Sequence, residues 1–160
     1  MTDAPLLDPT MRSFLAGSRT ATLATTSPSG RPRLVPICFV VGADDPNGRP
    51  RLHSPLDDKP KRSDDPHDLA RVRDLLVLPE ATLLVDHWSE DWDRLGWIRL
   101  ETRAELLEPE PHEAPEHDGA VRALRAKYPQ YATHRLEERP ILRFTVFRVV
   151  AWGRLEPDRA

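Results

Sequence analysis

The stretch Arg19–Val41 constrains the fold most, because it contains two strand-forming runs around a proline–glycine turn. Thr20–Thr26 is rich in β-branched residues. The return run Arg33–Val41 is dense in Val, Ile and Phe, which predicts a strand buried on both faces over part of its length. Ser27–Gly30, which reads Ser-Pro-Ser-Gly, is typical of a type I turn. The sequence therefore predicts an antiparallel hairpin near the N-terminus.

The same signals place four further strands and three helices. Asp45–Gly48 ends in Asn-Gly, which favours a hairpin turn into a third strand at Arg49–Ser54. We expect the first three strands to form a meander. The other predicted strands are Ala81–Trp88, Leu95–Leu107 and Ile141–Trp152, and the predicted helices are Pro9–Gly17, Asp65–Leu78 and Ala120–Tyr128. The acidic, proline-broken segment Glu108–Asp118 is interpreted as a surface loop with exposed histidines, His112 and His117.

Six strands joined mainly by hairpins predict a mainly β (α+β) fold, a six-stranded antiparallel Greek-key barrel with short peripheral helices. The period of two in Leu95–Leu107 supports this prediction, because charged residues and Trp97 alternate there with apolar residues and Thr102. The 160 residues fit a single domain over positions 1–160.

Composition excludes several classes of function. The net charge of -3 argues against a protein that binds nucleic acid with its whole surface, because no global positive field is present. No stretch approaches the roughly 18 apolar residues of a membrane span, and the N-terminus lacks a secretory pattern, so we expect a cytoplasmic protein with neither nucleic-acid nor membrane partners. The single cysteine, Cys38, is predicted to be a buried small hydrophobe. The six histidines lack metal-site spacing, so no metal site is predicted.

Three cations, Lys59, Lys61 and Arg62, lie within four residues directly after the third predicted strand. An arginine fork with two lysine charges suits a phosphate. From the local sequence alone, a solvated loop balanced by neighbouring aspartates is the favoured interpretation. The position after a barrel strand, where functional loops are common, favours an anion site instead.

Trp88, Trp92 and Trp97 surround the acidic loop between the fourth and fifth predicted strands. Such aromatic residues line the binding sites of planar cofactors and also form dimer interfaces, and both interpretations stay open. The sequence contains no nucleophile elbow, P-loop or dinucleotide fingerprint. If the protein is an enzyme, a bound organic cofactor should therefore supply the chemistry.

Two of these segments resemble those of a known family. The run ATLATTSPSGRPRLVPICFVV resembles the opening hairpin of the pyridoxamine 5'-phosphate oxidase-like (PPOX-class) split β-barrels, the FMN-binding split-barrel type. The later combination of KPKR, a helix and LLVDHWSEDW…WIR is similar to the actinobacterial branch that uses the deazaflavin coenzyme F420. The resemblance covers about Phe14 to Glu108.

The resemblance implies a homodimer with a cofactor at each of two equivalent interface sites. Basic residues would meet the cofactor phosphate, and the second strand would approach the ring. The end of the third strand would lie beneath the ribityl chain, and the second subunit would contribute residues of its long strand to the site. The residues implied for these contacts are Val35, Pro36, Ile37, His53, Ser54, Lys59, Lys61, Arg62, Trp97 and Arg99.

The activity implied is hydride transfer between F420 and a small organic substrate, with no side chain identified as the general acid. Alternatives are an FMN-dependent oxidoreductase and a non-catalytic cofactor- or haem-binding protein of the same fold. The tail Trp152–Ala160 lacks the Arg-x-His arrangement of the branch that oxidises pyridoxamine phosphate, and this departure favours the deazaflavin branch.

Overall fold

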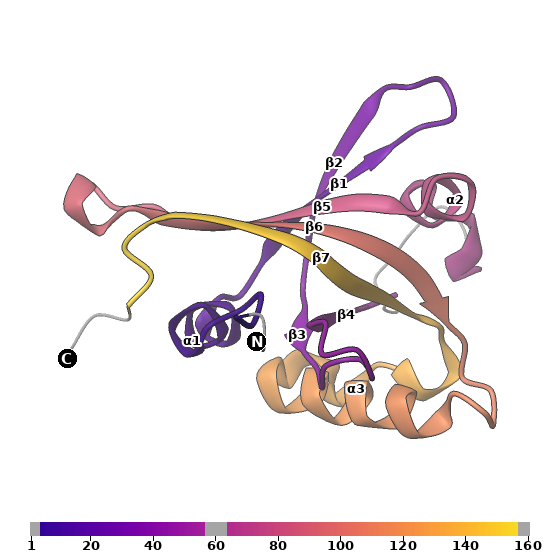
Figure 1. Cartoon of the computed structure of the whole chain (residues 1–160). Helices are drawn as coiled ribbons and strands as arrows, with labels where there is room; N and C mark the ends of the chain where they lie inside the picture. The colour runs from indigo at the N-terminus through magenta and orange to yellow at the C-terminus, as the bar shows by residue number, and fades with distance from the viewer. Residues whose placement is uncertain (1–3, 57–63, 157–160) are drawn as a thin grey trace.

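A computed structural model describes residues 4–56 and 64–156 and shows one antiparallel sheet with three α-helices (Figure 1). The elements, in chain order, are α1 (Pro9–Gly17), β1 (Ala21–Thr26), β2 (Pro32–Ile37), β3 (Val40–Val41), β4 (Arg51–Pro55), α2 (Ala70–Val77), β5 (Glu80–His87), β6 (Gly96–Leu107), α3 (Ala114–Lys127) and β7 (Ile141–Gly153). Short 3-10 turns cover Pro66–Asp68, Trp92–Arg94, Pro129–Thr133 and Leu136–Glu138.

The sheet is rolled into a half-barrel, as its strand order requires. The order is β2-β1-β5-β6-β7-β4-β3, so β2 and β3 form its two opposite edges. Strand β2 ends at Ile37, and β3 begins only three residues later, at Val40. Because three extended residues span about 10 Å, the two edges must approach each other at that corner. Figure 1 shows the chain passing from β2 to β3 behind and below the central strands. The predicted mainly β split-barrel fold is confirmed.

The region predicted as one strand, Arg33–Val41, is two strands with different partners. β2 pairs with β1, whereas β3 pairs with β4, so the predicted three-strand meander is wrong. Phe39 is fully buried at the break, where its N–H donates to the Tyr128 hydroxyl at 3.1 Å. The prediction of burial on both faces is also wrong for β2, because this edge strand leaves Leu34 71% exposed. A run of apolar residues cannot by itself show which neighbours will cover it.

The inner face of the rolled sheet holds the main hydrophobic core. Inward-facing residues of β1, β5 and β6 pack there with Leu52 of β4 and Phe144 of β7. α1 contributes Leu15 and α2 contributes Val72 and Leu75 to the same core. α1 ends at Gly17 as predicted, and Asp8 caps its start through a 2.8 Å bond from the Met11 N–H.

A second core lies on the outer face, where α3 covers β3, β4 and the start of β7. It joins Leu107 and Ile141 of the sheet to Val121 and Leu124 of α3. The helix begins at Ala114, inside the segment predicted as a loop, because its apolar stripe starts before the proline-broken run ends. His117 was predicted to be exposed, but it is buried and its Nε2 lies 2.6 Å from the Arg139 carbonyl oxygen. Cys38 packs against this core but is only partly buried.

Both predicted turns are confirmed by their glycines. The Gly30 N–H donates to the Ser27 carbonyl at 2.8 Å, and the Gly48 N–H donates to the Asp45 carbonyl at 2.9 Å. Both glycines have positive φ, at 84° and 77°. Within residues 4–56 and 64–156, no helix has the length and apolar character needed to cross a membrane.

Candidate functional site: the open face of the sheet

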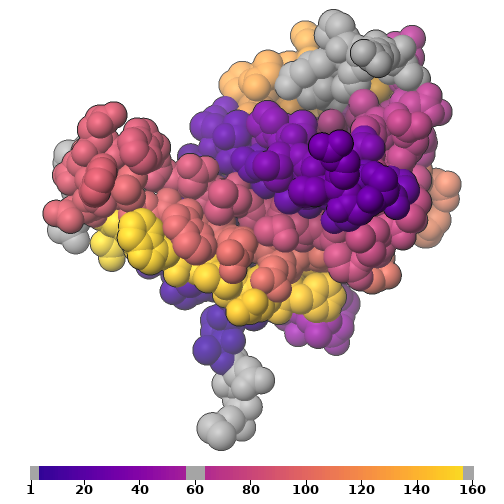
Figure 2. Space-filling view, turned by 90° about the horizontal axis from the view of Figure 1, so that it is seen from above, coloured from indigo at the N-terminus to yellow at the C-terminus, as the bar shows by residue number. Residues whose placement is uncertain are grey.

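The outer face of the sheet is covered by α3 at one edge and open elsewhere. Directly paired residues point to the same side of an antiparallel sheet. The register aligns Pro36, Thr22, Leu84, Arg99 and Val150 in one row across five strands. We call this surface the open face, and it consists of Thr22, Ala24, Leu34, Pro36, Thr82, Leu84, Asp86, Trp97, Arg99, Glu101, Arg148, Val150 and Trp152. In Figure 2 it is seen from above.

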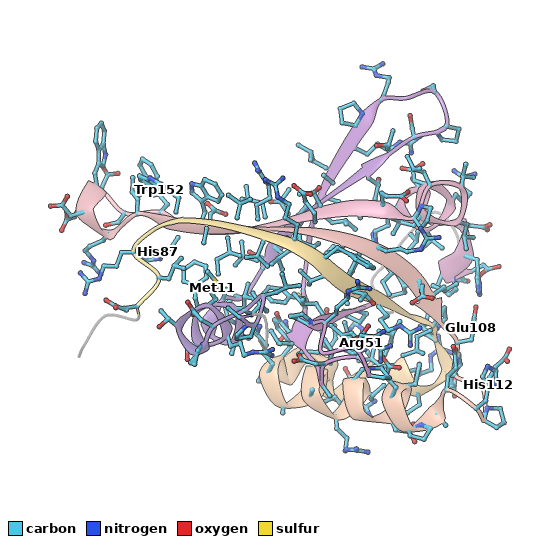
Figure 3. The ribbon with its side chains drawn as sticks, in the orientation of Figure 1. Met11, Arg51, His87, Glu108, His112 and Trp152 are labelled. Atoms are coloured by element: carbon cyan, nitrogen blue, oxygen red, sulfur yellow. The ribbon has the colours of Figure 1, made fainter. Side chains whose placement is uncertain are left out.

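Two tryptophans form an aromatic platform at one end of the open face. Trp97 of β6 lies directly opposite Trp152 of β7, which is 54% exposed. In Figure 3, Trp152 stands on the upper side of the sheet, away from α1 and α3. The Arg99 guanidinium lies 5.9 Å from the centre of the Trp97 ring and forms no ion pair with any described residue. An aromatic surface beside an available cation suits a planar, negatively charged ligand.

A recess of about 600 Å³ lies at the other end of the open face. The residues that line this recess include Leu78, which follows α2, and Phe147, which forms a bulge in β7. Behind it, buried Asp74 of α2 accepts a 2.9 Å bond from the Thr25 hydroxyl and lies 3.5 Å from the Arg33 guanidinium. These bonds tie α2 to the β1–β2 hairpin and so fix the wall of the recess.

A buried polar network lies on the same outer face, where α3 covers it. His53 of β4 is 3% exposed, and its Nε2 lies 2.9 Å from Glu116 Oε1 of α3. The other carboxylate oxygen of Glu116 accepts a 2.7 Å bond from Arg143, which also binds Glu105 at 2.9 Å. Arg51 of β4 lies beside this network, between β4 and α3 in Figure 3. The network borders a cavity of about 460 Å³ along α3.

The network holds its two titratable groups in fixed states. Burial lowers the pKa of His53, and the bond to Glu116 only partly offsets this effect. Burial alone would raise the pKa of Glu116, but the bond from His53 and the charge of Arg143 together hold it below its ordinary value. Near pH 7, His53 is therefore neutral and donates its Nε2–H to the Glu116 carboxylate.

The structure separates the predicted site residues by face. Pro36, Trp97 and Arg99 share the open face, with Pro36 on edge strand β2. His53 is on the same side of the sheet but beneath α3. Three residues point inward to the main core, as judged from their direct strand partners: Val35, Ile37 and Ser54. Lys59, Lys61 and Arg62 lie outside the described residues.

Two kinds of functional candidate were missed from the sequence. Leu84 and Trp152 belong to the open face, and the period of two in their strands would have placed them beside Arg99 and Trp97 once the register was known. Glu116 was missed because it lies in the segment interpreted as a loop. In the described part of the chain, no group of three His, Cys, Asp or Glu side chains is placed to hold a metal ion.

The family model of pyridoxamine 5'-phosphate oxidase matches residues 7–153, nearly the whole chain. The chain belongs to the pyridoxamine 5'-phosphate oxidase family. The resemblance seen in the sequence is thereby confirmed at the level of the family. No curated protein matches the chain.

Solved structures agree with this family fold. A conserved hypothetical protein from Mycobacterium tuberculosis aligns over 100% of this chain and 96% of its own, with a TM-score of 0.66 and 20% identity. HutZ, a heme storage protein from Vibrio cholerae, gives 0.61 and 14% identity over 92% of this chain and 94% of its own. An F420 reductase gives 0.58 and 15% identity over 87% of this chain and 94% of its own. At these identities the likeness concerns the fold alone.

Proposed function

We propose that this family member is an F420-dependent oxidoreductase that transfers a hydride between the deazaflavin ring and a small organic substrate. The observation that carries the proposal is the open face, where Trp97, Trp152 and Arg99 form an aromatic and cationic platform on an otherwise uncovered sheet. The ordered KPKR and HWSEDW motifs favour F420 over other cofactors of this fold.

The residues present fit a planar, phosphate-bearing cofactor. The tryptophan platform offers a flat apolar surface, and Arg99 offers a cation beside it. The edge strand β2 directs the backbone N–H and C=O of Leu34 and the C=O of Pro36 away from β1, where no strand pairs with them, so they are available to the polar rim of a ring. The family resemblance implies that Lys59, Lys61 and Arg62 would meet the phosphate. These are the groups that would hold the cofactor.

When bound, reduced F420 supplies a hydride from a carbon centre of its ring. The chain's own contribution is to position the two reactants and exclude water. Arg99, which has no ion-pair partner among the described residues, is available to donate a hydrogen bond to negative charge that develops on the acceptor. No described side chain is assigned as a general acid, and solvent water is the proposed proton source.

We further propose that a second copy of the chain covers the open face. Leu34, Leu84 and Trp152 are 71%, 36% and 54% exposed on this surface, and removing their apolar area from water would favour association. A two-fold homodimer would bury them and create two equivalent sites between the protomers. The cofactor would then lie between the tryptophan platform and residues of the partner.

Cofactor titration tests this function. Purified protein is titrated separately with F420, FMN and haem, and binding is followed by fluorescence or absorbance. We expect F420 to bind tightly and its reduced form to be consumed by at least one acceptor from a panel of enones, quinones and tetrapyrroles. Tight binding of FMN without a response to F420 would establish the flavin alternative. Tight haem binding without turnover would favour a storage role like that of HutZ.

A variant pair locates the cofactor on the open face. Arg99→Gln removes the cation beside Trp97, and we expect F420 affinity to fall by about tenfold or more, the loss typical of one desolvated charge-assisted bond. Arg103→Gln is the matched control, because Arg103 lies on the same strand and is exposed like Arg99, but pairs with Glu80 at 3.3 Å and does not lie beside Trp97. Equal affinity losses in the two variants would place the cofactor elsewhere.

A further inference from the structure

The β5–β6 hairpin ends in an acidic aromatic loop that projects from one end of the open face. We call residues 88–95 the tryptophan arm. Trp88 and Trp92 in this arm are 65% and 74% exposed. Glu90, Asp91 and Asp93 outnumber Arg94 and give the arm a net negative charge, and none of the three carboxylates forms an ion pair with a described residue. Figure 2 shows the arm extending at the left beyond the body of the molecule.

The end of the sheet opposite the arm, formed by the β1–β2 hairpin and α2, is basic and apolar. We call this surface the basic rim, and it consists of Arg31, Arg33, Leu34, Arg73, Leu76 and Val77. Leu34 there belongs to the open face, whereas Arg33 points to the other side of the sheet with its strand partner Thr25. Leu34, Leu76 and Val77 are 71%, 63% and 69% exposed. Arg31 and Arg73 form no ion pair with described residues, whereas Arg33 forms an ion pair with the buried Asp74. Figures 1 and 2 place α2 and the β1–β2 hairpin at the end of the sheet away from the arm.

We propose that the tryptophan arm of one protomer packs against the basic rim of its partner, twice in each dimer. This inference rests on the dimer of the proposed function and specifies how its two subunits are oriented. Two open faces can pack about a two-fold axis that runs along the strands or across them. An axis along the strands brings arm to arm and rim to rim, so that like charges meet. An axis across the strands brings each arm to the partner's rim.

Charge and apolar surface both select the second arrangement. Each tryptophan brings on the order of 150–250 Å² of surface that is favourable to bury, and the exposed Leu34, Leu76 and Val77 offer it an apolar counterpart. The free carboxylates of the arm would meet Arg31 and Arg73. Complementary charges of this kind fix the orientation of two partners and disfavour the alternative packing.

A charge-swap experiment on the full chain tests the orientation. The first variant carries Glu90→Lys and Asp93→Lys, so its arm and rim are both positive. The second carries Arg31→Glu and Arg73→Glu, so its arm and rim are both negative. We expect sedimentation velocity to show dimer dissociation at concentrations at least tenfold above those for the unmodified chain in each variant alone. An equimolar mixture should recover dimers, because both contacts of the heterodimer then join opposite charges.

The control carries Asp118→Lys and Arg122→Glu on α3, which changes as many charges outside the open face and should leave the dimer unchanged. Native mass spectrometry of the mixture should show the heterodimer as the main species. Swapped variants that dimerise like the unmodified chain, or a mixture that stays monomeric, would overturn the arm–rim contact. An unmodified chain that is monomeric would overturn it as well.

The outcome separates this inference from the cofactor proposal. If the swap behaves as expected while F420 fails to bind, the arm–rim contact stands and the proposed cofactor is wrong. If F420 binds and is turned over while the swap has no effect, the reaction stands and the arm–rim contact is wrong.

Discussion

Two regions of the outer face of the sheet differ in whether the chain itself covers them. Over β3, β4 and the start of β7, the chain covers the face with its own helix α3, and Leu107, Leu124 and Ile141 are each at most 1% exposed. Over β2, β1, β5 and the remainder of β6 and β7, nothing in the described chain covers the face. The comparison indicates that the covered region stabilises the fold, whereas the open region is available for a cofactor and a second subunit.

The largest expected effect comes from truncating one leucine in each region. Leu124 of α3 is fully buried in the core between this helix and the sheet, and Leu124→Ala should lower the free energy of unfolding by about 3 kcal/mol. Leu34→Ala in the open region should change monomer stability by less than about 0.5 kcal/mol, because Leu34 is 71% exposed. Urea unfolding at several protein concentrations measures both effects. Equal losses at every concentration would contradict the division into two regions.

A glycine in the covered region provides the next test. A Cβ on Gly42 would lie 2.6 Å from Cε1 and 2.8 Å from Nδ1 of His53, which is itself held by Glu116. Gly42→Ala should therefore displace the buried ring and cost about 1–3 kcal/mol. Gly17→Ala, where a Cβ has nothing within 4 Å, is the matched control. Chemical denaturation of both variants would reveal the clash, and equal stabilities would show that the ring moves freely.

The strand pattern and turns of this fold were predictable from the sequence, but the route of the chain between sheet edges was not. The alternation in β6 predicted which face Trp97 and Arg99 occupy, because local periodicity determines facing. The break at Phe39 depends on the Tyr128 hydroxyl, which comes from a distant part of the chain. Covering of His53 likewise depends on the docking of α3, a tertiary event without a local signal.

The pH dependence of stability distinguishes a covered histidine from an exposed one. Burial lowers the pKa of His53 in the folded state below its ordinary value of 6.5. Below pH 6.5 the unfolded chain therefore binds a proton at this histidine more readily than the folded chain, and stability is lost as pH falls. Hydrogen bonds that His67 donates to Glu108 and Asp65 raise its pKa, so its contribution is present below pH 6.5 and lost as pH rises through the folded-state pKa.

Variants at the two histidines should therefore change the pH profile in opposite directions. His53→Gln should flatten the loss of stability as pH falls below 6.5, whereas His67→Gln should steepen it. Thermal unfolding across this range measures the slopes. A His53→Gln profile parallel to that of the unmodified chain would show that the buried imidazole does not couple protonation to folding.

The smallest expected effect is a gain in stability at Gly119, within the helix that covers the outer face. The nearest atom to a Cβ built there is Arg122 Nη2 at 3.9 Å, which is ordinary van der Waals contact with the end of a flexible side chain. Gly119→Ala should raise the free energy of unfolding by about 0.5–1 kcal/mol, because alanine has the higher helix propensity. Urea unfolding should show this gain without a change in cofactor affinity, since α3 lies away from the open face. A gain in stability accompanied by altered dimerisation would instead connect α3 to the subunit contact and weaken the distinction between the covered and open regions.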